Sequence, residues 1–208
     1  ILTVALIVIG YYIYKTGKEK KKIARTVGRI MLTGWLIVLF NLISLVTRYE
    51  SVCSIAYSFY FIASNWMLYY LFRFSIDYLG YHFERHINRP VLITVLILDS
   101  LSVLLNSVFG HLFELRHVEM FGGESYYELA VKPLFYVHYT IILLLVVCCL
   151  IAFFYGTITA PVFYRKKYLI IALLTLSLAV INIFTVKSAV DVSVIGYVLE
   201  AVCIYHCS

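Results

Sequence analysis

The sequence predicts an all-α membrane protein, a seven-helix up-and-down bundle with its N-terminus outside and its C-terminus in the cytoplasm. Three observations predict this fold class. Hydrophobic residues make up 63% of the 208 residues and charged residues only 13%, a composition that leaves no water-soluble surface. Seven apolar stretches fill most of the chain. Positive charges concentrate in every second gap between these stretches, as they do in polytopic membrane proteins.

The seven stretches are expected to form the helices in order. Most are long enough to cross a hydrocarbon core of roughly 30 Å at about 1.5 Å per residue. We expect helices at residues 1–14, 28–46, 52–79, 91–109, 134–155, 168–186 and 190–206. Pro90, Pro133 and Pro161 stand at or just before predicted helix starts, where a missing N–H is harmless. The helices therefore read as continuous, without proline breaks.

The gaps between the helices predict the orientation. Most of the 17 lysines and arginines lie in the first, third and fifth gaps, and most acidic residues lie in the others. The positive-inside rule places the basic gaps in the cytoplasm. We therefore expect Lys20 and Lys166 at the cytoplasmic face and Glu119 outside. The net charge of +6 then faces anionic headgroups, so the expected partner is the lipid bilayer and not nucleic acid.

The two ends and one loop depart from the regular pattern. The first stretch is too short to span a membrane alone, and the chain stops at the end of the seventh. We expect residues 1–208 to be a single transmembrane domain with an output domain after residue 208. The outer segment 110–132 is unusually long, and is either a lid with some structure or a mobile segment. Gly122 and Gly123 would give it a turn and freedom to move.

Polar residues inside the predicted helices are the best functional clues, because unpartnered polar groups in hydrocarbon are unfavourable by several kcal/mol. Depth counting places Arg73, Asp99 and Glu200 in an inner layer. We expect Arg73 to pair with Asp99 or Glu200, either as a neutralising pair or as a switch between signalling states. The outer half holds Asn41, Asn106, Tyr136, His138, Tyr139 and Asn182, with Asn65 and Trp66 near mid-depth.

This outer set has two interpretations. Asparagine and tyrosine side chains commonly link helices in membrane bundles. They could equally line an outward-opening ligand pocket among aromatic residues. We expect the signal-input site between the second, fourth, fifth and sixth helices, under segment 110–132, where Asn41, Asn106, His138 and Asn182 should converge. Cys203, His206 and Cys207 share a helix face, but no fourth metal ligand is evident, so packing is the preferred interpretation.

The chain resembles the bacterial seven-helix sensor domain that precedes histidine kinase or diguanylate cyclase (GGDEF) modules. The resemblance covers the topology, the long outer loop and several aromatic motifs. These motifs are Trp66-Met-Leu-Tyr-Tyr, Phe74-Ser-Ile-Asp-Tyr78, Leu105-Asn-Ser-Val-Phe109, Tyr126-Tyr127 and Tyr164-Arg-Lys-Lys-Tyr168.

The resemblance implies a multi-pass receptor in the bacterial inner membrane that passes an extracellular or in-membrane signal to a fused cytoplasmic enzyme. A diguanylate cyclase output is favoured over a histidine kinase. The ligand would be an unknown small or lipid-like molecule. The protein would form a homodimer through its output domain. We expect no catalytic residue, cofactor or metal in this segment. The alternative class, a small-molecule or ion transporter or channel, would need a continuous polar path, whereas the polar residues here form two sparse layers.

Overall fold

The computed structural model describes residues 2–19, 22–79, 89–119, 125–185 and 193–207. Within these ranges the chain forms seven helices and one pair of antiparallel strands. The elements in chain order are α1 (Leu2–Gly17), α2 (Lys22–Val46), α3 (Glu50–Leu79), α4 (Arg89–Phe109), β1 (Phe113–Glu119), β2 (Ser125–Val131), α5 (Phe135–Thr159), α6 (Val162–Thr185) and α7 (Ser193–Cys207). The predicted seven-helix fold class is confirmed, with a β-hairpin added to it.

Two helices begin six residues earlier than the sequence predicted. α2 starts at Lys22 and α6 at Val162, before the predicted starts at 28 and 168. Both extensions carry lysine and arginine, which are good helix formers and keep a helix intact beyond the hydrocarbon. Hydropathy detects only the apolar part of such a helix. The prolines lie as expected, because Pro90 is the second residue of α4 and Pro161 immediately precedes α6.

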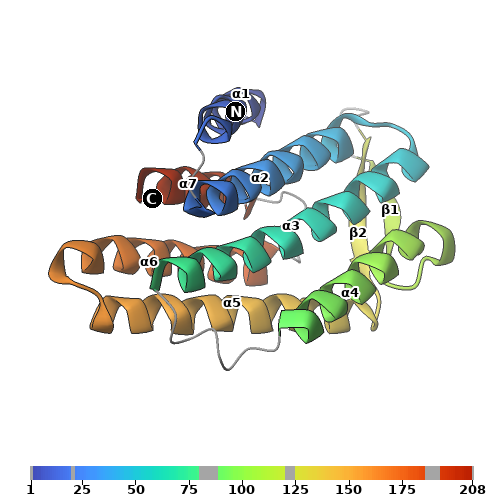
Figure 1. Cartoon of the computed structure of the whole chain (residues 1–208). Coiled ribbons are helices and arrows are strands. Elements are labelled where there is room, and N and C mark those ends of the chain that lie inside the picture. The colour runs from blue at the N-terminus through green and yellow to red at the C-terminus, as the bar shows by residue number, and fades with distance from the viewer. Residues whose placement is uncertain (1, 20–21, 80–88, 120–124, 186–192, 208) are drawn as a thin grey trace.

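The helix α3 occupies the centre of the molecule, in contact with α2, α4 and α5 (Figure 1). α1 and α7 pack against α2, and α6 connects α5 to α7 through contacts on both sides. α4 packs against α3 rather than against α5 along most of its length. Figure 1 shows why, because α4 is shifted along the bundle axis relative to α5.

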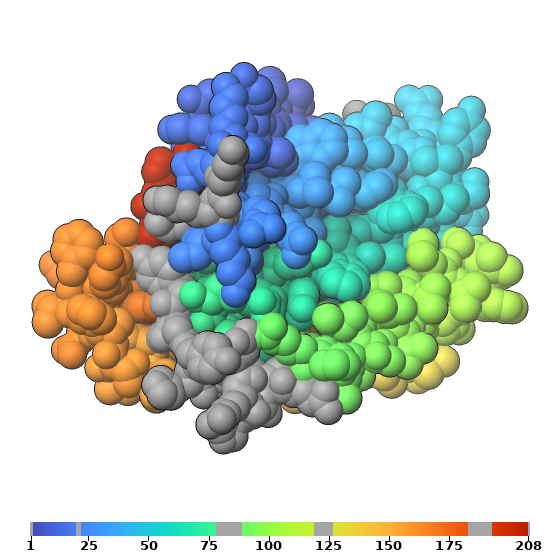
Figure 2. Space-filling model, viewed as in Figure 1, coloured from blue at the N-terminus to red at the C-terminus, as the bar shows by residue number. Residues whose placement is uncertain are grey.

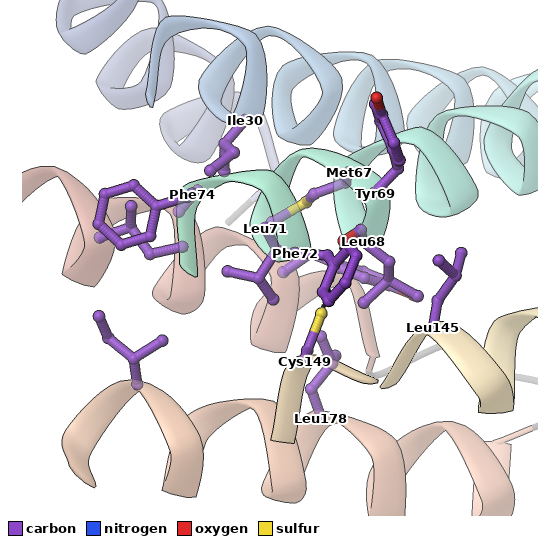
Figure 3. Close-up of a cluster of buried hydrophobic side chains, with 14 of the residues drawn as sticks. Ile30, Met67, Leu68, Tyr69, Leu71, Phe72, Phe74, Leu145, Cys149 and Leu178 are labelled. Carbon is purple, nitrogen blue, oxygen red and sulfur yellow. Dashed lines mark hydrogen bonds between the residues drawn. The ribbon is translucent and has the colours of Figure 1, made fainter. Parts of the chain in front are cut away.

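The main core forms where α3 meets its neighbours. Its buried side chains include Met67, Leu68 and Leu71, which lie between α2, α5 and α6 (Figure 3). Cys149 of α5 lies against this face, with its Sγ 3.6 Å from the carbonyl oxygen of Leu68. Close packing of this kind is what holds helices together in lipid, where the hydrophobic effect between helices is small.

Many apolar side chains point away from the bundle, whereas several polar side chains are buried inside it together with the apolar core. Leu98 is 61% exposed and Ile158 is 74% exposed, whereas Asn65 and Glu200 are fully or almost fully buried. Among the described helices, α2, α4 and α5 are long and apolar enough to cross a membrane, and α1 and α7 are shorter apolar helices. This pattern suits a bundle surrounded by lipid.

The outer segment 110–132 contains a β-hairpin in its described part. β1 and β2 pair antiparallel from Phe113 opposite Val131 to Glu119 opposite Ser125, and the strands run across the helix axes (Figure 1). Buried Phe113 packs with Val103 of α4 and Phe135 of α5 in a second, smaller core. The segment is thus a structured cover over the bundle, and Gly122 and Gly123 lie outside the described residues.

Candidate functional site

Three polar side chains from three helices meet inside the bundle. The Nδ1 atom of His138 on α5 lies 2.9 Å from Oδ2 and 3.1 Å from Oδ1 of Asp99 on α4. The amide of Asn65 on α3 donates to the same Asp99 carboxylate at 2.6 Å. Asn65, Asp99 and His138 are hereafter called the polar triad. All three are buried, with relative exposures of 0%, 7% and 1%.

The triad is enclosed by aromatic rings and reinforced by a neighbouring bond. The rings of Phe61 and Phe135 both lie 5.5 Å from the imidazole of His138, centroid to centroid. One residue further along both helices, the indole N–H of Trp66 donates to the Ser100 hydroxyl at 3.2 Å. α3 and α4 are therefore joined by two successive pairs of side chains at the same level.

The chemistry of the triad follows from its hydrogen bonds. A carboxylate accepts from both His138 and Asn65, so the imidazole Nδ1 carries the proton in this arrangement. Among the described residues, Nε2 of His138 and Oδ1 of Asn65 have no hydrogen-bond partner. Buried polar groups without a hydrogen-bond partner raise the free energy of the fold. A rearrangement that gives them partners would therefore be stabilised. The triad therefore has unused hydrogen-bonding capacity that a rearrangement of the helices would satisfy.

The triad joins residues that the sequence analysis had put in different layers. Asp99 was assigned to the inner layer and His138 to the outer one, but they are bonded. α4 and α5 run antiparallel, and Asp99 lies ten residues before the end of α4 whereas His138 lies only three after the start of α5. At about 1.5 Å per residue this requires a stagger of roughly 10–15 Å between the helices. Depth counting assumed level helix ends, which the shift of α4 contradicts (Figure 1).

The expected ion pair of Arg73 with Asp99 or Glu200 is corrected by the structure. Arg73 pairs with Asp77 one turn along its own helix, with Nη2 3.4 Å from Oδ1. Asp99 is engaged in the triad instead, and Glu200 of α7 accepts a hydrogen bond from Thr175 of α6. Asp77 was not selected from the sequence because it lies near the helix end, although its spacing of four from Arg73 was the available signal.

The four asparagine and histidine side chains expected to line one pocket do not meet in the described contacts. Asn106 bonds to the hairpin, with Nδ2 donating to the Phe113 carbonyl and Oδ1 accepting from the N–H groups of Leu112 and Phe113. Asn182 donates to the Leu178 carbonyl of its own helix. Asn41 is buried on α2. Of these four residues, only His138 belongs to the triad. The direction of each side chain depends on the rotation of its helix, which cannot be derived from depth along the helix.

The two tyrosines of the expected pocket lie in different surroundings. Tyr136 is 62% exposed. Tyr139 is partly buried against the small core under the hairpin. They are three residues apart, yet only Tyr139 lies on the side of α5 that faces the hairpin.

An open cleft, hereafter called the outer cleft because the sequence predicts that this end of the bundle faces outside, lies beside the small core. It has a volume of about 730 Å³ and lies between the α2–α3 turn, the end of α4 and the hairpin. The hydroxyl of Tyr127 donates to the Arg48 carbonyl at 3.2 Å and joins the hairpin to the turn. Asn106 is the one residue of the expected pocket that lines it. The cleft is therefore displaced from the predicted position towards α3.

An ion pair joins the two ends of the hairpin at its base, and a hydrogen bond links the same lysine to the residue that follows α4. Lys132 lies 2.9 Å from a carboxylate oxygen of Glu114 and also donates to the Gly110 carbonyl at 2.8 Å. The hydrogen bond from Lys132 lowers the pKa of Glu114, and the charge of Lys132 lowers it further. A lowered folded-state pKa stabilises the fold above the ordinary pKa of a glutamate, and this contribution is lost as the pH falls through the lowered value.

The fold and buried polar groups define a polytopic seven-helix membrane protein. A family model described as the N-terminal 7TM region of histidine kinase matches residues 1–207. The chain belongs to this family. No curated protein matches it with significance. The family match favours a histidine kinase as the output module and does not support the diguanylate cyclase preferred in the sequence analysis.

Proposed function

We propose that this domain is the signal-input part of a histidine kinase in the bacterial inner membrane, and that the polar triad is its switch. The outer cleft would receive an external or lipid-like signal. The triad would then distinguish two arrangements of α3, α4 and α5. A ligand shifts such an equilibrium only by its difference in affinity for the two arrangements.

The observation that carries the proposal is a continuous set of side-chain contacts from the cleft to the triad. Phe113, which lines the cleft, packs edge-to-face on Phe61 with centroids 5.6 Å apart. Phe61 in turn contacts Phe135 and the imidazole of His138. A displacement of the hairpin would therefore act on the ring that bonds Asp99. Packed interiors move between discrete arrangements rather than deforming continuously.

The transporter or channel alternative is less well supported. The buried polar groups of the described residues occur as separate pairs and one triad. Tyr60 bonds Ser193 between α3 and α7, Thr175 bonds Glu200 between α6 and α7, and the triad joins α3, α4 and α5. Apolar core residues such as Met67 and Leu68 lie in the same bundle. A permeation route would need polar groups in sequence along one path.

The test is autophosphorylation of the intact kinase in inverted membrane vesicles. Asp99→Asn removes the charge while keeping the shape, and His138→Phe removes the bond to α4. We expect each to change basal autophosphorylation about fivefold or more, the lower end of typical coupling between sites. Thr140→Ala is the matched control, because its exposed hydroxyl bonds only within α5 in the described contacts. If both triad variants phosphorylate at the rate of the Thr140→Ala control, the triad is not a switch.

A further inference from the structure

A second cavity lies at the opposite end of the bundle from the outer cleft, between the start of α2 and the end of α3. Its volume is about 230 Å³. Four basic side chains line it with one carboxylate, one hydroxyl and two phenols: Lys22, Arg25, Thr26, Arg29, Tyr69, Tyr70, Arg73 and Asp77. Figure 2 shows these two helix ends (blue and blue-green) together on one face. This group of residues is called the basic pocket.

The floor of the basic pocket is built around the buried carboxylate of Asp77, whose side chain is 5% exposed. Lys22 Nζ lies 3.1 Å from it and Arg73 Nη2 lies 3.4 Å from it. The hydroxyl of Thr26 also points at this carboxylate, at 3.4 Å. Asp77 therefore neutralises only part of the positive charge and orients two of the basic side chains.

The remaining positive charge is presented by Arg25 and Arg29, which are exposed and one turn apart on the same face of α2. The guanidinium of Arg29 lies over the ring of Tyr70 at 5.6 Å, which restricts its orientation. Within the described part of the chain, neither arginine makes an ion pair with a carboxylate. Guanidinium groups donate in a planar fork that matches the oxygens of a phosphate.

The surroundings of the basic pocket favour a phospholipid over free phosphate as the ligand. Leu32 is 47% exposed three residues after Arg29, so apolar surface continues from the pocket along α2. Tyrosines such as Tyr69 and Tyr70 are typical of the membrane–water interface. A phospholipid would place its phosphate among the arginines and an acyl chain along this surface. A free phosphate would use only the first part.

We propose that the basic pocket binds the phosphate group of an anionic phospholipid. Basic pockets between helices at the cytoplasmic face are suited to such headgroups. The site is separate from the triad and the outer cleft, so its occupation is independent of the signal-input proposal.

The test is native mass spectrometry of the intact protein titrated with phosphatidylglycerol. Losing the charge-assisted hydrogen bonds of two guanidinium groups should weaken phosphatidylglycerol binding by roughly 30-fold in the Arg25→Gln, Arg29→Gln double variant. Lys18→Gln with Lys166→Gln is the matched control, because it removes the same charge from two exposed lysines outside the pocket. The control should retain binding close to that of the unmodified protein.

Two further measurements keep the result interpretable. Arg29→Lys keeps the charge but loses the planar guanidinium donors, so it should weaken lipid binding less than the double variant does. The thermal unfolding temperature should be unchanged in both variants. Competition with inorganic phosphate separates the two sources of the anion. Equal loss of lipid in the double variant and the control would overturn the proposal. So would displacement of phosphatidylglycerol by inorganic phosphate at equal concentration, since it would assign the pocket to a soluble anion.

Discussion

Asp99 is the one carboxyl group of the polar triad, and both of its partners lie on other helices. It accepts from Asn65 of α3 and from His138 of α5, so a single carboxylate links three helices. α4 otherwise packs mainly on α3, which makes the Asp99–His138 bond its principal described link to α5. Removing the acceptor of buried hydrogen-bond donors is far more damaging than replacing both partners by apolar groups, because the donors are left desolvated and unpaired.

This asymmetry predicts a strong coupling in a double-mutant cycle. Asp99→Ala should lower the free energy of unfolding by roughly 2–4 kcal/mol, because His138 and Asn65 lose their acceptor. Adding His138→Ala should restore part of the loss. The measurement is unfolding in mixed detergent micelles, with Thr140→Ala as a surface control. Additive losses in the double variant would show that Asp99 and His138 contribute independently.

Sequence reasoning identified every member of the triad but not their association. Asn65, Asp99 and His138 were each selected because polar groups inside hydrocarbon need partners. Their grouping depends on the stagger of α4 against α5 and on the rotation of each helix. Neither quantity is encoded by hydropathy, which reports where a helix is apolar and not which way it faces.

At the scale of elements, the hairpin is attached to the helices through Asn106. Its side chain makes three hydrogen bonds to the backbone of residues 112 and 113, where the chain leaves α4 and enters β1. The Gly110 backbone, with φ of +56°, makes the sharp turn just before it. A conformation with positive φ favours glycine over all other residues.

We therefore predict that Asn106→Ala loosens the hairpin while leaving the helices intact. Two buried N–H groups would lose their acceptor, so the local stability should fall by about 2 kcal/mol or more. Hydrogen–deuterium exchange of the amides of residues 112–118 should become faster. Ser107→Ala is the control, because this exposed hydroxyl bonds only to the Leu104 carbonyl of its own helix in the described contacts. Unchanged exchange in Asn106→Ala would assign the hairpin's attachment to Lys132 and the small core.

The helices were predictable and the hairpin was not, for a physical reason. Long apolar runs determine helices in lipid regardless of detail. The hairpin signal was present as alternation, with Phe113 and Leu115 on one strand and Leu129 and Val131 on the other, around Gly122 and Gly123. It was weak beside the hydropathy signal, because each strand alternates over only a few residues.

At the scale of the whole molecule, the orientation remains a prediction of charge. Lys166 on α6 should face the cytoplasm and Glu128 on β2 should face outside. Of the other two residues used to predict the orientation, Lys20 lies outside the described residues and Glu119 is the last residue of β1.

Cysteine labelling tests the orientation directly. Cysteines placed at positions 128 and 166 should react with an impermeant maleimide in whole cells at 128 only. The unmodified chain is the background, since it holds free cysteines such as exposed Cys148. Labelling at 166 and protection at 128 would invert the topology and place the outer cleft in the cytoplasm.

The length of α3 connects this protein to the thickness of its membrane. With 30 residues the helix is about 45 Å long, whereas the hydrocarbon core is about 30 Å thick. Such a helix tilts or reaches into both headgroup layers, and its tilt follows the thickness of the bilayer. Because α2, α4 and α5 all pack on α3, a thinner or thicker bilayer would reorient all three together. Acyl-chain length is thus a physical variable to which the bundle is coupled, in addition to any molecule bound in its outer cleft.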